Sequence, residues 1–591
     1  MNAWRPSSLL LSVALGFVLP VQSAAQESAP TTAFILDTAA RTVTALDVVT
    51  AKPIATVNLE GEPTRLLRTK GGARLVVLER GPGKPRPPYG VRPTGKSAVT
   101  VIDPATMKAL ARFELGWGLG DSLLTDDGAR LLVACPGFKS NKPPETLGGE
   151  LVTVDLMTPQ IAGRVALERP INSLLIAADG RTALAFSARE TGKKPADNVP
   201  AELRFVDLPG PTTAAALKFD GAPGRATLSP EGKFVYLLDV GSPATKKLKA
   251  VDGRLHVVSL ERREIQKSID VGTDPRGLVV DPDDQQVLIL SDGPPTKERN
   301  EETGELRVVR GSELVSTVKV ATRPSFSRIA PDRDRLHVVG SKSLTTVDYS
   351  SFHVEGNMPL QSAGVSFVAT GGRADELAIT PDGKRGFVLY SLSSKVAVLD
   401  LASRTLIAAV TTGRGGVKFG KFMASVAASA AVGAATGMAY GPYYYAPYDV
   451  YNVAEPNTSI AVRPDGKFAY VLNTQTNDVT IVDAEKGAVV DKIAGAGHRV
   501  QLMTAGGALA IVGPSLTFID TTLHKAVPEL TLPGLTTLAL SPDGRHGVAL
   551  LAGGVACLDG STGKVMARAG GFKQPAQVLF NMEARPSKSA P

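Results

Sequence analysis

The sequence predicts an all-β protein made of about eleven repeated four-stranded antiparallel sheets. Three observations support this prediction: a short pattern of strands and turns, its recurrence along the chain, and two turn markers that recur in step. A single sheet of about 35 residues is too small to bury its own faces, so copies of it have to stack. We therefore expect a repeat protein whose architecture comes from the stacking of these sheets.

The clearest copy of the unit runs from Ser459 to Ile493. Within it, β-branched and other apolar residues form short runs that Pro, Gly, Asn and Asp interrupt, which is the pattern of strands joined by hairpins. The expected strands are Ile460–Val462, Phe468–Leu472, Val479–Val482 and Ala488–Ile493.

Two markers recur in phase and count the units. The first is the turn between the first and second strands, often Pro-Asp-Gly, and it lies at 70–72, 126–128, 178–180, 230–232, 282–284, 331–333, 381–383, 464–466, 505–507 and 542–544. The second is an Asp that closes the third strand, where an Asx-type turn would use its carboxylate to accept backbone N–H groups. It occurs at Asp47, Asp103, Asp155, Asp207, Asp348, Asp400, Asp483, Asp520 and Asp559, and Ser259 and Arg310 take its place in two units.

Eleven third strands follow from this count, and the first unit, Phe34–Leu59, lacks a first strand. Four-stranded sheets stacked around an axis make a β-propeller, whose rings usually hold four to eight blades. Eleven units therefore predict either two propeller domains or one unusual ring. The preferred division is 26–372 with about seven blades and 373–585 with about four, followed by a tail at 586–591. The marker spacing agrees, since it is 51 to 56 residues in the first half and falls to 37 and 39 near the end.

The strand that completes the first unit has two candidates. Val365–Ala369, within the extra segment Gln361–Gly372, would close a ring of seven blades. Gln577–Asn581 would instead join the two ends of the chain. The sequence leaves both alternatives open.

The units resemble the YVTN-type β-propeller repeat. The match lies in Pro464-Asp465-Gly466-Lys467, Tyr470-Val471-Leu472-Asn473 and Val479-Thr480-Ile481-Val482-Asp483. A second good copy runs from Pro381 to Asp400, and a third, weaker one from Pro542 to Asp559. The resemblance implies a propeller in a secreted or surface setting. It implies no single activity, because such repeats occur in binding proteins, in lactonase-like enzymes and in redox proteins.

The N-terminus and the composition bear on location. Arg5, the apolar run Leu9–Val21 and Ser23-Ala24-Ala25 have the order of a secretory signal peptide, expected to span 1–25 and to be cleaved before Gln26. We therefore expect a secreted protein, periplasmic or extracellular, with a net charge of +7 after removal of Arg5 (8 − 1). The basic charge suits an anionic cell-surface polymer or an acidic protein. The sequence contains no dense basic run with interleaved aromatics, so nucleic acid is not indicated as a partner.

Cys135 and Cys557 lie in apolar runs and are expected to be buried strand residues.

Enlarged loops join the second and third strands of the first-half units. They are Arg80–Lys96, Pro136–Gly148, Arg189–Glu202, Asp239–Asp252 and Ser291–Gly304. Because successive blades point alike, these loops are expected to form one crown on one face, where binding residues are common. The expected binding residues are the basic ones, Arg80, Lys84, Arg86, Arg92, Lys96, Lys246, Lys247 and Lys249.

Signals for catalysis or for a cofactor are weak. The sequence holds no GxSxG, Walker loop, HExxH or CxxCH motif. His256 and His337 each sit in an Arg-Leu-His-Val-Val run and are expected to be sheet residues rather than metal ligands. No catalytic residue, metal or cofactor is predicted, although a lactonase-like hydrolase would bring a divalent cation.

The insertion at 411–457 breaks the repeat. Gly420–Tyr440 is rich in Ala, and its small residues at intervals of four would let a second helix approach closely. Six tyrosines follow, at Tyr440, Tyr443, Tyr444, Tyr445, Tyr448 and Tyr451. The insertion could serve as a cap on the propeller, as a contact with another chain through 420–440, or, with less support, as a membrane contact.

The leading functional hypothesis is a non-enzymatic secreted scaffold that binds a protein or a ligand through the loop crown, the Tyr-rich insertion or both. The alternative is a lactonase-like hydrolase or a propeller redox enzyme with a site at the mouth of the channel.

Overall fold

The computed structural model describes residues 32–581, apart from the gaps 86–90, 142–143, 168–170, 172, 191–198, 209–211, 220, 222, 242–251, 273–274, 276, 282, 284, 293–302, 361–375, 390–394, 413–456, 474–477, 495–498, 503–507, 513–514, 542 and 561. The regular secondary structure of the described residues consists of β-strands and one 3₁₀ turn at Lys70–Gly72 (η1). The predicted signal peptide, almost all of the 411–457 insertion and the tail lie outside the described residues.

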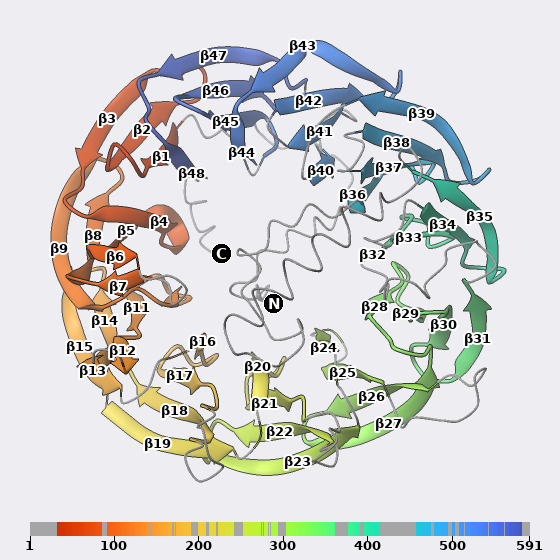
Figure 1. Ribbon diagram of the computed structural model, residues 1–591, viewed down its shortest axis with the longest axis horizontal. Helices are drawn as coiled ribbons and strands as arrows, with labels where there is room; N and C mark the ends of the chain where they lie inside the picture. Colours follow the sequence, from red (N-terminus) through yellow and green to blue (C-terminus); the bar gives the residue numbers. More distant parts are fainter. Residues whose placement is uncertain are drawn as a thin grey trace, which may run out of the picture.

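Eleven four-stranded antiparallel sheets follow one another around a single ring (Figure 1). In all but the first, the chain builds the sheet from its innermost to its outermost strand and then crosses to the next sheet. The predicted all-β propeller of about eleven blades is thereby confirmed.

The blades are numbered from the N-terminus, and their strands are given from the inside outward. Blades 1 to 4 contain β48 (Pro575–Phe580), β1 (Thr32–Asp37), β2 (Thr42–Asp47) and β3 (Pro53–Asn58); β4 (Glu62–Arg68), β5 (Leu75–Arg80), β8 (Lys96–Asp103) and β9 (Lys108–Trp117); β10 (Ser122–Leu124), β11 (Arg130–Cys135), β14 (Gly149–Asp155) and β15 (Gln160–Leu167); and β16 (Ser173–Ile176), β17 (Thr182–Ser187), β18 (Ala201–Asp207) and β19 (Thr212–Phe219).

Blades 5 to 8 continue the same plan. They contain β20 (Pro223–Leu228), β21 (Phe234–Asp239), β22 (Gly253–Ser259) and β23 (Glu264–Gly272); β24 (Gly277–Asp281), β25 (Gln286–Ser291), β26 (Gly304–Arg310) and β27 (Glu313–Val320); β28 (Phe326–Ile329), β29 (Arg335–Val339), β30 (Ser343–Asp348) and β31 (Val354–Pro359); and β32 (Glu376–Ile379), β33 (Arg385–Leu389), β34 (Lys395–Asp400) and β35 (Thr405–Thr411).

Blades 9 to 11 complete the ring. They contain β36 (Asn457–Val462), β37 (Phe468–Asn473), β38 (Asp478–Asp483) and β39 (Ala488–Ala494); β40 (Arg499–Leu502), β41 (Ala508–Val512), β42 (Ser515–Asp520) and β43 (Lys525–Pro533); and β44 (Leu535–Leu540), β45 (His546–Leu551), β46 (Gly554–Asp559) and β47 (Val565–Gly570). Blade 9 has the four strands expected for the clearest copy of the unit.

The last described strand closes the ring. β48 pairs with β1 and supplies the strand that the first unit lacks, with Ala33 opposite Phe580. The buried carboxylate of Asp37 accepts the N–H groups of Lys573 at 2.6 Å and Gln574 at 3.0 Å and so fixes the approach to β48. Closure near Gln577–Asn581, one of the two alternatives, is therefore confirmed, and the competing segment Val365–Ala369 lies outside the described residues.

The hydrophobic core is divided among the blade interfaces. Eleven clusters of buried apolar residues are present, and each lies between two neighbouring blades. One cluster joins Leu344 of blade 7 to Leu377 of blade 8, across the predicted domain boundary at residue 372. Another joins Ile35 of blade 1 to Val548 of blade 11. The sheets thus share cores all the way around one ring, which is the second of the two alternatives that the blade count left open.

The closing Asp residues form the predicted Asx-type turns. In each case the carboxylate accepts N–H groups from residues two or three positions further along the chain. They are Asp47, Asp103, Asp155, Asp348, Asp400, Asp483, Asp520 and Asp559. Asp207 instead binds the guanidinium of Arg263 from the next blade. Each of these carboxylates thus has a structural role, as a hydrogen-bond acceptor in its own turn or as the ion-pair partner of the next blade.

Candidate binding face

The connections between second and third strands lie on one face of the ring, opposite the face that carries the Pro-Asp-Gly turns, because each sheet is antiparallel. In blade 2 this connection forms an extra hairpin, β6 (Gly83–Pro85) with β7 (Val91–Pro93). In blade 3 it forms β12 (Phe138–Asn141) with β13 (Pro144–Leu147). Blade 4 has a single bridge between Glu190 and Val199. We call the face formed by these three extensions the hairpin face.

The base of the blade 2 hairpin is held by its own backbone. The carbonyl of Pro82 accepts N–H groups from Thr94 at 2.7 Å and Gly95 at 3.1 Å. Gly81 is required beside it, since a Cβ there would lie 2.3 Å from the Gly95 carbonyl oxygen. The hairpin therefore leaves the blade in a defined direction.

The blade 3 hairpin is fixed to the neighbouring blade. The Gly137 N–H donates to the carbonyl of Trp117, at the end of β9, at 2.9 Å. Gly137 has a φ of 71°, and a Cβ on it would lie 2.3 Å from the Leu147 carbonyl oxygen. The Gly116 N–H donates to Sγ of Cys135 at 3.2 Å. Burial raises the pKa of the Cys135 thiol to about 12, so this cysteine is a neutral packing residue.

Two of the predicted basic residues are available on this face. Arg80 ends β5 and Lys84 lies on β6, and both side chains are exposed. Neither makes an ion pair with a residue that the structure describes. Lys84 pairs in register with Arg92 of β7, so basic residues stand opposite one another in the hairpin. Exposed cations without a carboxylate partner are suited to an anionic ligand.

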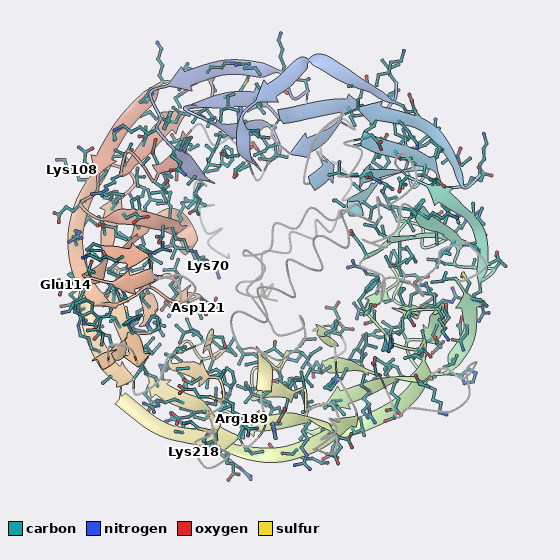
Figure 2. The ribbon with its side chains drawn as sticks, in the orientation of Figure 1. Lys70, Lys108, Glu114, Asp121, Arg189 and Lys218 are labelled. Atoms are coloured by element: carbon teal, nitrogen blue, oxygen red, sulfur yellow. The ribbon has the colours of Figure 1, made fainter. Side chains whose placement is uncertain are left out.

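Lys96, in contrast to Arg80 and Lys84, has a carboxylate partner. Its ammonium group lies 2.8 Å from the Glu114 carboxylate on β9, and this contact holds the pKa of Glu114 below its usual range. Lys96 thus already has a carboxylate partner, and its predicted role in binding stays a prediction. Figure 2 shows Glu114 and Lys108 on the outer rim of the ring and Lys70 on its inner side.

Two other acids near the blade 2 hairpin, Glu60 and Glu79, are paired with an arginine, whereas the exposed Glu62, opposite Arg80 in the sheet register, makes no ion pair with a described residue. Arg112 contacts Glu60 at 3.2 Å and the buried Glu79 at 3.4 Å. Glu79 also accepts the Gly61 N–H at 2.6 Å and the Thr100 hydroxyl. The sequence pattern gave no signal for this network, because its members come from four separate strands and turns.

In blade 3, Arg164 forms an ion pair with Glu150. Its guanidinium lies 2.7 Å from the Glu150 carboxylate of the adjacent strand and also donates to the carbonyl of Glu114. Blades 2 and 3 are thus joined by the hydrogen bond from the Arg164 guanidinium to the Glu114 backbone carbonyl. Arg80 and Lys84, near the base of the blade 2 hairpin, make no ion pair with a described residue.

The remaining predicted binding residues lie where the structure gives no side-chain description. Lys246, Lys247 and Lys249 fall in the 242–251 gap, Arg86 falls in the 86–90 gap, and only the backbone of Arg92 is described. The tyrosines Tyr440, Tyr443, Tyr444, Tyr445, Tyr448 and Tyr451 all fall in the 413–456 gap.

The histidines examined for metal binding are strand residues. His256 lies on β22 with Nδ1 2.8 Å from Ser268 Oγ, and burial lowers its pKa. His337 lies on β29, and burial lowers its pKa to about 4. Among the described residues, no group of three His, Cys, Asp or Glu side chains is placed to hold a metal ion.

The described part of the chain contains no helix with the length and apolar character needed to span a membrane.

The fold and the extended face define the class: an eleven-bladed β-propeller with hairpins added to one face. No family model matches the chain, and neither does any curated protein. The YVTN repeat is therefore a sequence resemblance without a family match.

Solved structures show only a distant likeness. A structure of the eukaryotic initiation factor is 11% identical, covers 95% of this chain and 100% of its own, and has a TM-score of 0.43. The dihydro-heme d1 dehydrogenase NirN in complex with DHE is 15% identical over 66% of this chain and 75% of its own, with a TM-score of 0.29. Apo AztD from Citrobacter koseri is 11% identical over 73% of this chain and 94% of its own, with a TM-score of 0.30. None of these values supports an inference about function.

Proposed function

We propose that this protein is a secreted β-propeller scaffold whose hairpin face binds an anionic protein or cell-surface polymer. The observation that supports the proposal is the presence of backbone-bonded extensions at the same place in three neighbouring blades. Loops held on a rigid scaffold are common binding sites, because the entropy lost in ordering them is lost on folding and not on binding.

The charges of the hairpin face favour an anion over other ligands. Acids near the hairpin bases, such as Glu79 and Glu114, are engaged by Arg112 and Lys96, while Arg80 and Lys84 are exposed and make no ion pair with described residues. In this proposal the Tyr-rich insertion at 411–457 provides a second contact, and 420–440 could join two copies of the chain. The proposal assigns the protein no cofactor and no nucleic acid partner.

The first experiment reverses the two available charges. Arg80→Glu together with Lys84→Glu is expected to weaken binding of the mature protein to immobilised heparin and poly-glutamate by about tenfold or more at low salt. Lys108→Glu, an exposed lysine of the same blade on the outer strand β9, is the matched control and should retain most of the binding. Equal binding by the double variant and the control would contradict the proposal.

A second variant tests the hairpin as a unit. Because the Pro82 carbonyl already bonds to Thr94, residues 83–93 can be replaced by a two-residue turn without altering β5 or β8. We expect an unchanged melting temperature and reduced retention on both matrices. Retention equal to that of the intact protein would rule out the hairpin as the binding element.

A further inference from the structure

Blade 5 departs from the repeat at both turn markers. Glu231 stands where most units have the Asp of the first turn, and Ser259 stands where most have the closing Asp. In blades 1 and 9 the closing carboxylate accepts the N–H two residues further along, from Val49 and Glu485. In blade 5 the Ser259 hydroxyl accepts only the Arg262 N–H, at 3.1 Å.

Because Ser259 replaces the closing Asp, one backbone N–H group of this turn has no acceptor among the described residues. Glu261 occupies the position that Val49 and Glu485 hold in the other turns. Its N–H donates to no acceptor within the part of the chain that the structure describes. The turn nevertheless keeps its shape, because the Arg263 N–H donates to the Ser259 carbonyl at 2.9 Å. Blade 5 thus presents a donor that a carboxylate satisfies elsewhere in the same ring.

A pocket of about 390 Å³ lies at this turn. It opens between blades 4 and 5 on the face opposite the hairpins, where the shorter Ser259 side chain takes less room than an Asp. Its lining residues are Ala177, Asp179, Gly232, Lys233, Phe234, Ser259, Leu260, Glu261, Arg262 and Gln266.

The polar groups of the pocket favour an anionic group with two acceptor oxygens. Lys233 supplies a cationic donor at its edge, and Arg262 supplies a second one that also lies 3.7 Å from the Glu264 carboxylate. The Glu261 side chain is part of the lining as well. The carboxylate of Asp179 is already engaged by its own turn, since it accepts the N–H groups of Arg181 at 2.8 Å and Thr182 at 3.0 Å. Charged hydrogen bonds to a carboxylate are stronger than neutral ones.

We propose that the blade 5 pocket binds a carboxylate group, which accepts the Glu261 N–H in the place of the closing Asp. The carboxylate comes either from an acidic side chain of a peptide or from a small dicarboxylic acid. The inference is independent of the hairpin face, because the two sites lie on opposite faces of the ring.

The test places an Asp at position 259, where most other blades have their closing Asp. Saturation-transfer NMR would be used to titrate the mature protein with sodium succinate and, separately, with the peptide acetyl-Gly-Glu-Gly-amide, at constant ionic strength. We expect saturable binding of at least one probe. Ser259→Asp should weaken it at least tenfold, because the new carboxylate takes the Glu261 N–H for itself. Preference for one probe identifies the source of the carboxylate.

A second substitution checks the result without changing the turn. Lys233→Ala should weaken binding several-fold, while Lys108→Ala, an exposed lysine of blade 2, should have no effect. Absence of saturable binding for both probes, or equal affinity in the wild type and Ser259→Asp, would overturn the proposal. The melting temperature of each variant shows that it is folded, and if Ser259→Asp fails this check the Lys233→Ala and Lys108→Ala pair decides.

Discussion

His337 is an ionisable residue inside the sheet of blade 7. It is 1% exposed, and its Nδ1 lies 3.2 Å from the hydroxyl of Thr346, its cross-strand partner. Burial lowers the pKa of His337 from 6.5 to about 4, and the nearby Arg335 adds to the effect. The folded protein therefore holds this imidazole neutral at pH values where an unfolded chain would protonate it.

This difference predicts an acid-sensitive stability. The folded pKa lies below the unfolded value, so the contribution is complete above pH 6.5 and is lost as the pH falls toward 4. The loss is of the order of 3 kcal/mol, at about 1.4 kcal/mol for each pKa unit. His337→Gln should flatten the fall in melting temperature between these two pH values. His353→Gln, at an exposed position in the same blade, should not, and equal pH profiles for the two variants would contradict the assignment.

At the level of single residues, the sequence predicted roles that depend on local chain geometry. The Asx-type turns at Asp47 and Asp483 were predictable because donor and acceptor are two or three residues apart. The ion pair of Lys96 could not be predicted, because its partner Glu114 lies 18 residues away across a hairpin with two register shifts. Sequence alone does not give that register.

At the level of elements, β48 differs from every other innermost strand because it comes from the opposite end of the chain. The Gln577 amide donates to the Leu66 carbonyl at 2.7 Å and accepts the Leu66 N–H at 2.8 Å, which joins β48 to blade 2. Phe580 and Val578 fill the core between blades 11 and 1.

Removal of this strand should open the ring. A chain ending after residue 572 loses β48 and its apolar contacts, and we expect a large drop in melting temperature together with binding of a hydrophobic dye. A chain ending after residue 581 retains β48 and is the matched control, with properties close to those of the full chain. A melting temperature unchanged by the shorter truncation would show that β48 does not close the ring.

The strands of the blades were predictable because alternating apolar residues and turn residues mark them, as in β37 and β38. The hairpins of the candidate face were expected only as loops. The strands β6 and β7 have three residues each and contain Pro and Gly, so no period of two can be read from them. The backbone bonds at Pro82 and the β6–β7 pairing show how the described part of this connection is held.

At the level of the whole molecule, the blade count was predictable and the ring was not. The prediction of two domains followed from the usual ring size and from the shorter marker spacing near the C-terminus. That spacing instead reflects shorter connections between second and third strands near the C-terminus. The connection runs from Val512 to Ser515 in blade 10, compared with Asp239 to Gly253 in blade 5. Loop length varies around the ring while the blade stays the same.

A fragment tests the single ring directly. Residues 26–372 end between blades 7 and 8, so the fragment would expose Leu344 and Met358, which otherwise pack against Leu377 and Val388. It would also lack β48. We expect the fragment to aggregate or to bind a hydrophobic dye, whereas the chain 26–581 is monodisperse in size-exclusion chromatography. A stable, monomeric fragment would restore the two-domain interpretation.

The position of β48 also sets an order of events during synthesis. Blades 2 to 11 each close within a short continuous segment, so their hairpins can form as the chain emerges from the ribosome. Blade 1 is translated first, yet it is completed only when residues 575–580 become available. The inner edge of β1 therefore stays unpaired while blades 2 to 11 are translated, and a chain that lacks β48 cannot form the native ring.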